Sequence, residues 1–297
     1  MALSRLSVVL LEATAEDDKM TLNRRTLLTT GAALPFAGLA AGTARAEAPM
    51  MGASMANHRR FMIGDFEVTT ILAGTAPREN PQGIFGMNVS EEEFATVSEQ
   101  NFLATDVSNF FFTPTLVNTG SELVLFDTGL NGPATVAAIA SAGYTPDQVD
   151  IIVLTHMHGD HIGGLLTDGM PTFPNARYVA GQVEYDHWAG AENERFEANV
   201  RPMADMMTFI GDGEDVVSGL TGMAAFGHTP GHMVYRIDSA GSGLMIFADL
   251  ANHPVWSLAR PDWEVRFDAD KESAAASRRN VLDMIAADRI PAIGYHM

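Results

Sequence analysis

Short apolar segments separated by turn residues recur from about residue 60 onward, a pattern typical of β-strands. Residues 149–154 form a continuous apolar run, which predicts a strand buried on both faces. The turn residues at 118–120, Asn-Thr-Gly, predict a hairpin between the two segments that flank them. The other predicted strands lie at 66–72, 111–117, 123–126, 216–219, 223–226, 233–237 and 244–247.

Helical patterns lie between and after these strands. Residues 133–142 are rich in alanine, residues 181–208 are predicted to be helical (most clearly 192–207), and residues 271–288 place Ala274, Val281 and Ile285 on one face. Residues 74–86 are punctuated by Pro and Gly and predict a loop. Two groups of strands with helices between them predict a single layered α/β (α+β) domain over residues 61–297.

Composition and charge exclude several classes of function. The 297 residues contain 18 basic and 37 acidic side chains, for a net charge of −19, which disfavours binding to nucleic acid or to an anionic membrane surface. The chain contains no cysteine, which excludes disulfides, a thiolate nucleophile, an iron–sulfur cluster and cysteine-ligated zinc. Any metal must therefore be held by His, Asp and Glu.

The first 46 residues are typical of an export signal. Arg24 and Arg25 precede an apolar stretch, and small residues at Ala44 and Ala46 suit a cleavage site. The paired arginines indicate the twin-arginine route, with its translocase as a transit partner and a periplasmic or secreted mature protein. The apolar stretch is shorter than the roughly 20 residues of a spanning helix, so stable membrane insertion is not expected, although a membrane anchor is the alternative. Met20 offers a second start, and residues 47–60 are predicted to be a linker.

The strongest candidate chemistry directly follows the buried run at 149–154. His156, His158, Asp160 and His161 lie within six residues. Alternate residues at a strand end point the same way, so His156 and His158 can reach one metal, while Asp160 and His161 turn toward a neighbouring position after Gly159. Clustered His and Asp side chains are the ligand set expected for zinc, and the alternative is a polar loop with incidental histidines.

Other candidate residues occur at turns and strand ends later in the chain. His228 and His232 lie in a Gly/Pro turn, Asp249 follows the segment 244–247, and His296 follows a short apolar run. We expect His232 to support a ligand or to belong to a strand, because the other five histidines already fill the imidazole positions. Asp127 is likewise expected to support the site. Three further histidines fit no motif and are expected at the surface: His58, His187 and His253.

These residues together resemble the metallo-β-lactamase superfamily, and within it the branch of methyl parathion hydrolase and related lactonases. The resemblance spans most of residues 60–297 and includes Asp127-Thr128-Gly129, the HxHxDH motif, GHTPGH and Asp249. It implies an αβ/βα sandwich with a metal pair at one edge of two sheets. It also implies that one metal is held by His156, His158 and His228, the other by Asp160, His161 and His296, and that Asp249 bridges them.

Seven nitrogen and oxygen ligands suit two Zn²⁺ per chain, with Mn, Co or Fe also compatible. The expected reaction is hydrolysis by a metal-bridging hydroxide, with Asp160 and Asp249 as catalytic residues that orient it or pass a proton to the leaving group. Relatives of this branch continue beyond the last ligand. We therefore expect either a truncated C-terminus or a frayed His296, and a homodimer stays open.

The expected substrate is a small neutral ester-like molecule: a lactone, an aryl ester or an organophosphate triester. The bridging Asp249 disfavours a β-lactamase, and the scarcity of basic residues near the C-terminus disfavours a glyoxalase II-like thioesterase. A non-catalytic metal-binding or sensing protein is the alternative from another class. Candidate pocket walls are Phe110, Phe111, Phe112, Trp188 and the 83–89 loop with Ile84, Phe85 and Met87.

Overall fold

The continuous apolar run of the sequence forms strand β7 (Ile151–Leu154), in which all four residues are buried. The computed structural model describes residues 56–297, so the predicted signal segment and most of the predicted linker lie outside the described residues. Strand β7 lies within a seven-stranded sheet and pairs in parallel with a strand on each side. In sheet order the strands are β1 (His58–Ile63), β2 (Phe66–Ile71), β5 (Thr115–Asn118), β6 (Leu123–Phe126), β7, β10 (Arg177–Gly181) and β11 (Met207–Ile210).

A second sheet of five strands forms from the later part of the chain. Its first four strands pair antiparallel, and the last pairs in parallel with its neighbour. In order they are β12 (Asp215–Val217), β13 (Leu220–Ala224), β14 (Met233–Ser239), β15 (Ser242–Ala248) and β16 (Ala292–Gly294). Two separate two-stranded ribbons are formed by β3 (Gly74–Glu79) with β4 (Val107–Phe112) and by β8 (Leu166–Thr167) with β9 (Met170–Pro171).

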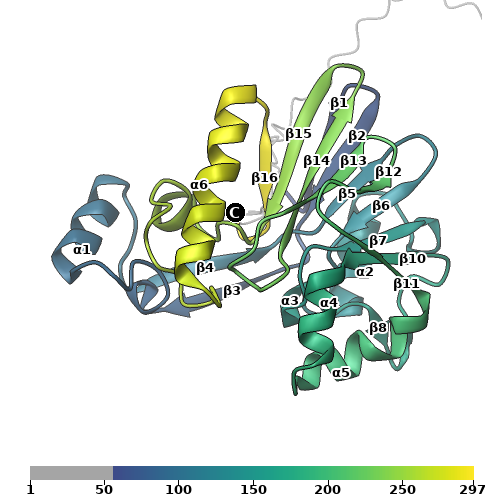
Figure 1. Ribbon diagram of the computed structural model, residues 1–297, viewed down its shortest axis with the longest axis horizontal. Coiled ribbons are helices and arrows are strands. Elements are labelled where there is room, and N and C mark those ends of the chain that lie inside the picture. Colours follow the sequence, from purple (N-terminus) through teal and green to yellow (C-terminus); the bar gives the residue numbers. More distant parts are fainter. Residues whose placement is uncertain (1–55) are drawn as a thin grey trace, which may run out of the picture. The chain divides into compact units, whose positions relative to one another are not determined.

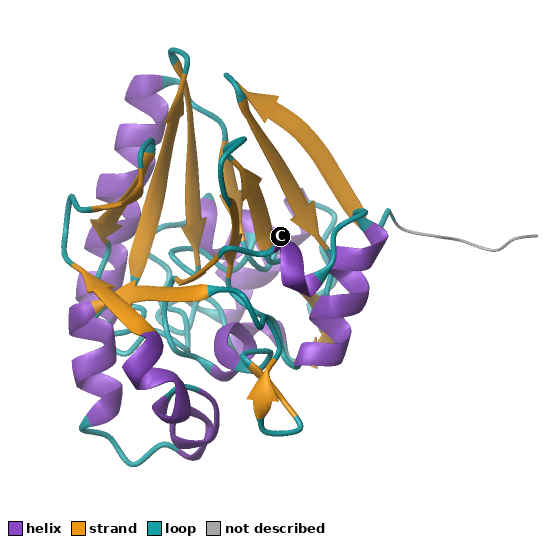
Figure 2. Ribbon diagram, turned by 90° about the vertical axis from the view of Figure 1, so that its right-hand side faces the viewer, coloured by secondary structure: helices purple, strands orange, loops and turns teal. Residues whose placement is uncertain are grey.

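The two sheets pack face to face, and helices cover their outer faces (Figures 1 and 2). Val124 and Val153 of the large sheet share one buried cluster with Tyr235 and Leu244 of the small sheet. The helices are α1 (Glu91–Gln100), α2 (Gly132–Ser141), α3 (Gly159–Ile162), α4 (Gln182–Ala189), α5 (Glu194–Asn199) and α6 (Lys271–Asp288). Short turns of other helix types lie at η1 (Pro81–Gly83), η2 (Pro146–Gln148), η3 (Arg201–Met206) and η4 (Pro254–Leu258).

Two further clusters complete the layers. Ile139 of α2 and Phe196 of α5 pack against the outer face of the large sheet, where Ile152 is buried. Val281 of α6 packs against Met245 of the small sheet, and α6 runs beside β15 and β16 in Figure 1. The order helix, sheet, sheet, helix confirms the predicted αβ/βα sandwich. Within residues 56–297, no helix combines the length and the apolar content that a membrane crossing needs.

The structure corrects several predicted boundaries. The predicted strand 111–117 is two strands, because Pro114 separates β4, which pairs with β3, from β5, which joins the large sheet. Residues 74–79, predicted as loop, form β3, and residues 58–60, assigned to the linker, belong to β1.

The predicted helix 181–208 is wrong as one element. Helix α4 ends before Gly190, and α5 begins after Asn193, whose side chain accepts from two backbone N–H groups of the new helix. The segment that follows is the 3₁₀ turn η3, and it has Pro202 in its first turn. Local capping and Pro residues therefore divide the segment into three pieces.

Candidate metal centre

The loop after β7 brings the HxHxDH motif to the edge where the two sheets meet. His156 lies one residue beyond the end of the strand and is fully buried, whereas His158 is the residue before α3 and is partly open. Asp160 and His161 lie in the single turn of α3. The change from extended chain to helix at His158 turns these last two side chains toward a second position, as the sequence predicts.

The other three candidate ligands reach this place from the small sheet. His228 lies in the turn between β13 and β14, Asp249 follows β15, and His296 follows β16. All three are buried. Ala248, just before Asp249, has a φ of 46°, a left-handed conformation that a non-glycine residue adopts only at a cost in free energy. The end of β15 is thus bent at the residue that aims the carboxylate.

Seven candidate side chains converge in two groups whose potential ligand atoms lie within 4.8 Å of one another in each group. The groups are His156, His158, His228 and Asp249, and Asp160, His161 and His296. The structure thus brings together every residue that the sequence predicts as a metal ligand. The division into two groups matches the division implied by the family resemblance.

Distances between the facing atoms are close to those expected between ligands of one metal ion. His158 Nδ1 lies 3.0 Å from His156 Nε2 and 3.1 Å from His228 Nε2. Asp249 Oδ2 lies 3.3 Å from His228 Nε2 and 3.1 Å from His296 Nε2. A tetrahedral shell with ligands at about 2.0–2.1 Å from zinc has edges of about 3.3–3.4 Å. Asp249 therefore stands between the two groups, where a bridging ligand belongs.

Two buried polar atoms in the described residues lack a hydrogen bond where a cation would satisfy them. They are His161 Nε2 and Asp249 Oδ1, which lie 3.4 Å apart. Buried polar groups are nearly always paired, so each unpaired one calls for an explanation such as a missing ion. The donor set and the two unpaired atoms both fit a pair of borderline divalent cations such as Zn²⁺.

Charge balance in the cluster agrees with this fit. Burial and neighbouring imidazoles lower the pKa of His156 well below its usual value, and burial with His228 nearby lowers the pKa of His158 to about 3. Burial alone would lower the pKa of His228, but hydrogen bonds to Asp249 and Asp268 raise it to about 9. His156 and His158 therefore stay neutral and keep a free lone pair, whereas the carboxylates stabilise the protonated form of His228. Metal binding requires the same free lone pairs and releases the protons held beside the carboxylates.

Partners behind the ligands fix which ring nitrogen faces the centre. Asp127 Oδ2 accepts from His161 Nδ1 at 2.8 Å, so its predicted supporting role agrees with its position. The same carboxylate accepts from the backbone N–H and hydroxyl of Thr155. His296 Nδ1–H donates to the Phe111 carbonyl at 2.8 Å, and the imidazole is buried although only one residue follows it. Such hydrogen bonds orient ligands and raise their basicity.

A second supporting pair escaped the sequence analysis. His228 Nδ1 lies 3.0 Å from Asp268 Oδ1, and Arg278 Nη1 donates to Asp268 Oδ2 at 2.8 Å. Asp268 and Arg278 are both buried. Because Arg278 lies on α6, the hydrogen bonds from Arg278 to Asp268 and between Asp268 and His228 connect the outer helix to the candidate metal centre. The sequence predicts a surface helix at this segment, so nothing in it indicated that Arg278 would be buried.

Glu184 of α4, also missed from the sequence, joins the two ligand-bearing loops. Its Oε1 accepts from the Met157 N–H at 2.8 Å and from Trp188 Nε1 at 2.7 Å. Its Oε2 accepts from the Thr229 hydroxyl at 2.7 Å and from the Gly231 N–H at 2.9 Å. A Cβ at Gly231 would lie 2.1 Å from the Glu184 backbone nitrogen, so the second loop needs glycine there. This group of contacts is called the Glu184 brace below.

The remaining histidines differ in how well their positions agree with the predictions. His232 is fully buried beside His156, and within the described chain neither of its ring nitrogens has a hydrogen-bond partner, so it contributes packing next to β14. His58 and His187 are exposed, as predicted. The surface prediction for His253 is wrong: it stacks on Trp256 at 4.0 Å, and its Nδ1 accepts the first backbone N–H groups of η4.

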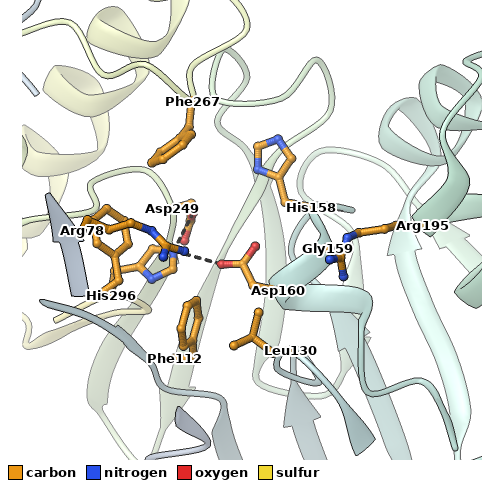
Figure 3. A pocket seen from close by; sticks show the side chains of 11 residues that line it. Arg78, Phe112, Leu130, His158, Gly159, Asp160, Arg195, Asp249, Phe267 and His296 are labelled. Carbon is orange, nitrogen blue, oxygen red and sulfur yellow. Dashed lines mark hydrogen bonds and ion pairs between the residues drawn. The ribbon is translucent and has the colours of Figure 1, made fainter. Parts of the chain in front are cut away.

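A pocket of about 280 Å³ opens over the ligands (Figure 3). Of the predicted walls, Phe110 and Phe112 line it, whereas Ile84 and Phe85 pack behind them in the same buried cluster and do not line the pocket. Met87 is exposed and lies outside this lining. The lining that the sequence analysis missed consists of Leu130, Phe267, Arg78 and Arg195. The two arginines are an unexpected finding, because the sequence predicts a pocket for a neutral molecule.

Phe111 and Trp188 approach the site without lining the pocket. The Phe111 carbonyl accepts from His296, and the Trp188 ring lies 5.9 Å from the His158 ring. Both residues therefore contact the ligands rather than a substrate. Tyr295 adds a further contact that the sequence did not indicate, since its hydroxyl donates to the Asp160 carbonyl at 2.6 Å.

Comparison with known proteins agrees with this geometry. Residues 113–292 match the metallo-beta-lactamase superfamily. The chain belongs to this superfamily. An N-acyl homoserine lactonase of Bacillus cereus is 27% identical to this chain over 155 residues, which are 52% of this chain and 58% of that protein. The alignment therefore spans little more than half the length of this curated relative.

Solved structures extend the likeness over most of the chain. AidC, described as a dizinc quorum-quenching lactonase, superposes with a TM-score of 0.74 and 26% identity over 81% of this chain and 90% of its own. The hydrolase AbOPH of the beta lactamase superfamily gives a TM-score of 0.75 over 82% of this chain and 91% of its own. At 22% identity the second likeness shows the fold alone.

Proposed function

We propose that this chain is a metal-dependent hydrolase of lactones and related esters, with two Zn²⁺ ions as its cofactor. The observation that carries the proposal is the position of Asp249 between two groups of ligands at the base of an open pocket. The names of the lactonase relatives support the substrate class. His156, His158 and His228 would hold one ion, Asp160, His161 and His296 the other, and Asp249 both.

When bound, such a cation pair lowers the pKa of water toward neutrality and polarises the oxygen of an ester-like group. The side chains of this protein then perform separate tasks. Asp249 is almost fully buried and keeps the two groups of ligands in register. Asp160, whose side chain is 24% exposed, is the carboxylate that a substrate can reach. Its Oδ2 faces His296, so its other carboxylate oxygen would accept a proton from the attacking water and return it to the leaving oxygen. Phe110 and Phe112 exclude water from the reacting group.

Within this reaction class, we rank lactones and esters first and phosphotriesters as a secondary activity. The scissile group is uncharged in each case, and attack occurs at carbon or at phosphorus. A panel of acyl-homoserine lactones, aryl esters, methyl parathion, a cephalosporin and a glutathione thioester tests the ranking through kcat/KM. A tenfold advantage of the cephalosporin or the thioester over an ester that also carries a carboxylate, about 1.4 kcal/mol of transition-state preference, would contradict the proposal.

A non-catalytic metal-binding or sensing protein is the competing function. The open pocket above the ligands favours the enzyme, because a protein that only holds a metal has no use for an accessible coordination position. Metal analysis and turnover measured on one preparation separate the two. About two metal ions per chain without turnover of any ester, lactone or triester would favour the sensor.

The sequence also supports export by the twin-arginine route, and we propose a periplasmic or secreted mature protein that begins near Glu47. Replacing Arg24 and Arg25 together by lysine should leave the precursor inside the cell. Cell fractionation and N-terminal sequencing provide the measurement. A protein of full length in the cytosol of the unmodified strain would contradict the proposal.

A further inference from the structure

Two guanidinium groups line the pocket above the candidate metal ligands. Arg78 comes from β3 and Arg195 from α5, and in Figure 3 they lie on opposite sides of Asp160. They are far apart in the sequence, and neither belongs to a recognised motif. Their meeting at one pocket is a property of the tertiary structure.

Neither guanidinium forms an ion pair with another residue of the described chain. Arg78 donates only to the neighbouring Pro77 carbonyl, at 3.4 Å, and lies 5.7 Å from the centre of the Phe110 ring. The side chain of Arg195 makes no hydrogen bond or ion pair within residues 56–297. Five other arginines of the same region do pair with carboxylates: Arg60, Arg201, Arg236, Arg278 and Arg279. Of the twelve arginines in this region, seven lack such a partner, and Arg78 and Arg195 are the two of these seven that line this pocket.

The position of Arg195 depends on a glycine of the HxHxDH motif. A Cβ at Gly159 would lie 2.4 Å from Arg195 Cδ and 2.9 Å from Arg195 Nε. The arginine therefore lies directly against the backbone of α3, next to Asp160. Arg78 is held on its own side by the Phe110 face. Both cations are thus positioned at the pocket by contacts with its walls.

The carboxylates of the pocket do not account for these cations. Asp160 and Asp249 are the two acidic residues of the described lining, and both face candidate ligands. A pair of divalent cations would more than offset their negative charge. The guanidinium groups therefore remain available to an anion that enters from solution, and planar guanidinium groups match carboxylates in bidentate geometry.

We propose that Arg78 and Arg195 make the pocket favourable for a carboxylate of the substrate, so that the preferred substrates are lactones or esters with a carboxylate remote from the scissile bond. This inference rests on the proposed hydrolase function. Phe112, Leu130 and Phe267 supply an apolar wall for the body of such a molecule. Because the protein as a whole repels anions, the two arginines give the pocket a local preference that the net charge of −19 opposes.

A matched pair of aryl esters tests the proposal: 4-acetoxybenzoate, which carries the carboxylate, and the neutral 4-acetoxybenzamide of nearly the same shape. The zinc-loaded wild type should prefer the benzoate about tenfold in kcat/KM, since two exposed guanidinium groups that attract the carboxylate are each expected to contribute about threefold to fivefold. Arg78→Met and Arg195→Met should each lower kcat/KM for the benzoate about threefold to fivefold. Neither variant should change kcat/KM for the benzamide by more than about twofold. The loss should appear in KM, because the carboxylate is remote from the reacting bond.

Two further variants serve as controls. Arg195→Lys keeps the charge and should recover part of the preference, whereas Arg260→Met removes an exposed arginine outside the pocket and should change neither ester. Equal rates for the two esters in the wild type, or equal losses for both in the Met variants, would overturn the proposal.

Calorimetric binding of the products 4-hydroxybenzoate and 4-hydroxybenzamide gives a readout that does not need turnover. Arginine-dependent binding of the benzoate without hydrolysis of any ester or lactone would refute the proposed function and leave the carboxylate site standing. Hydrolysis of neutral esters with no arginine-dependent benzoate binding would refute the carboxylate site and leave the proposed function standing.

Discussion

Replacing Glu184 by alanine removes the acceptor of the Glu184 brace. Four donors then lose their partner inside the protein: the backbone N–H groups of Met157 and Gly231, the Thr229 hydroxyl and the Trp188 indole. Met157 lies between His156 and His158, and Thr229 follows His228 directly, so both loops that carry the first group of ligands lose a common support.

The size of the effect follows from these contacts. Glu184 is fully buried, so at least the two backbone N–H groups become unsatisfied in the interior, each at a cost of about 1–3 kcal/mol. With the cavity and the two side-chain donors, we expect a loss of about 4 kcal/mol in the free energy of unfolding. For a domain of this size, that loss lowers Tm by about 8–16 °C. Glu184→Gln keeps the volume and part of the acceptor capacity and should cost about half as much.

The brace also predicts an effect on metal binding. Because it joins the loops that hold His156, His158 and His228, we expect a 10- to 100-fold lower affinity for one of two zinc ions, the size seen when the partners behind metal ligands are lost. Competition with a chelator, at a temperature where the variant is folded, measures the two affinities separately. Circular dichroism measures Tm on the same samples.

Asp186→Ala is the matched control, because Asp186 is an exposed acidic residue on the same helix whose side chain accepts only from Gln182. It should change Tm by less than about 2 °C, in line with ordinary surface substitutions. A Glu184→Ala variant that matches this control in Tm and in both zinc affinities would show that the brace does not support the ligand loops. An equal loss at both zinc positions would show that it stabilises only the fold.

Three other perturbations test separate parts of the centre. Asp249→Ala should lower zinc content from two ions toward one and remove most activity, because the bridge holds both positions; two ions with a near-normal rate would refute the bridging role. Arg278→Met leaves the buried Asp268 without its cation and should cost about 3–5 kcal/mol in urea unfolding, while a loss below 1 kcal/mol would mean that His228 alone satisfies this carboxylate. Removing metal with a chelator should lower Tm, and added zinc should restore it, because cations that bind only the folded state stabilise it by mass action. An unchanged Tm after verified metal removal would argue against a structural contribution of the centre.

The sequence alone was enough to predict the layered fold and the residues that meet at the centre. A buried strand is an unbroken apolar run, and the chain that leaves its end carries side chains in a known alternation, so 149–154 and the motif after it could be interpreted locally. Asp249 and His296 each follow a short apolar strand, which alone is a weak signal, and the resemblance to the metallo-β-lactamase superfamily implied their roles as ligands. Boundaries were less certain where one residue decides them, as Pro114 does between β4 and β5.

Only the tertiary structure decided which side chains support the ligands and which reach the substrate. Glu184, Asp268 and Arg278 lie in helical or loop segments, where a charged residue is normally predicted to be exposed. They are buried because residues from distant segments supply their hydrogen-bond partners. Arg78 and Arg195 likewise share a pocket only because β3 and α5 flank the same loop. Strand patterns record the local periodicity of burial, whereas a buried charge and a pocket depend on contacts between residues far apart in the chain, which no local pattern encodes.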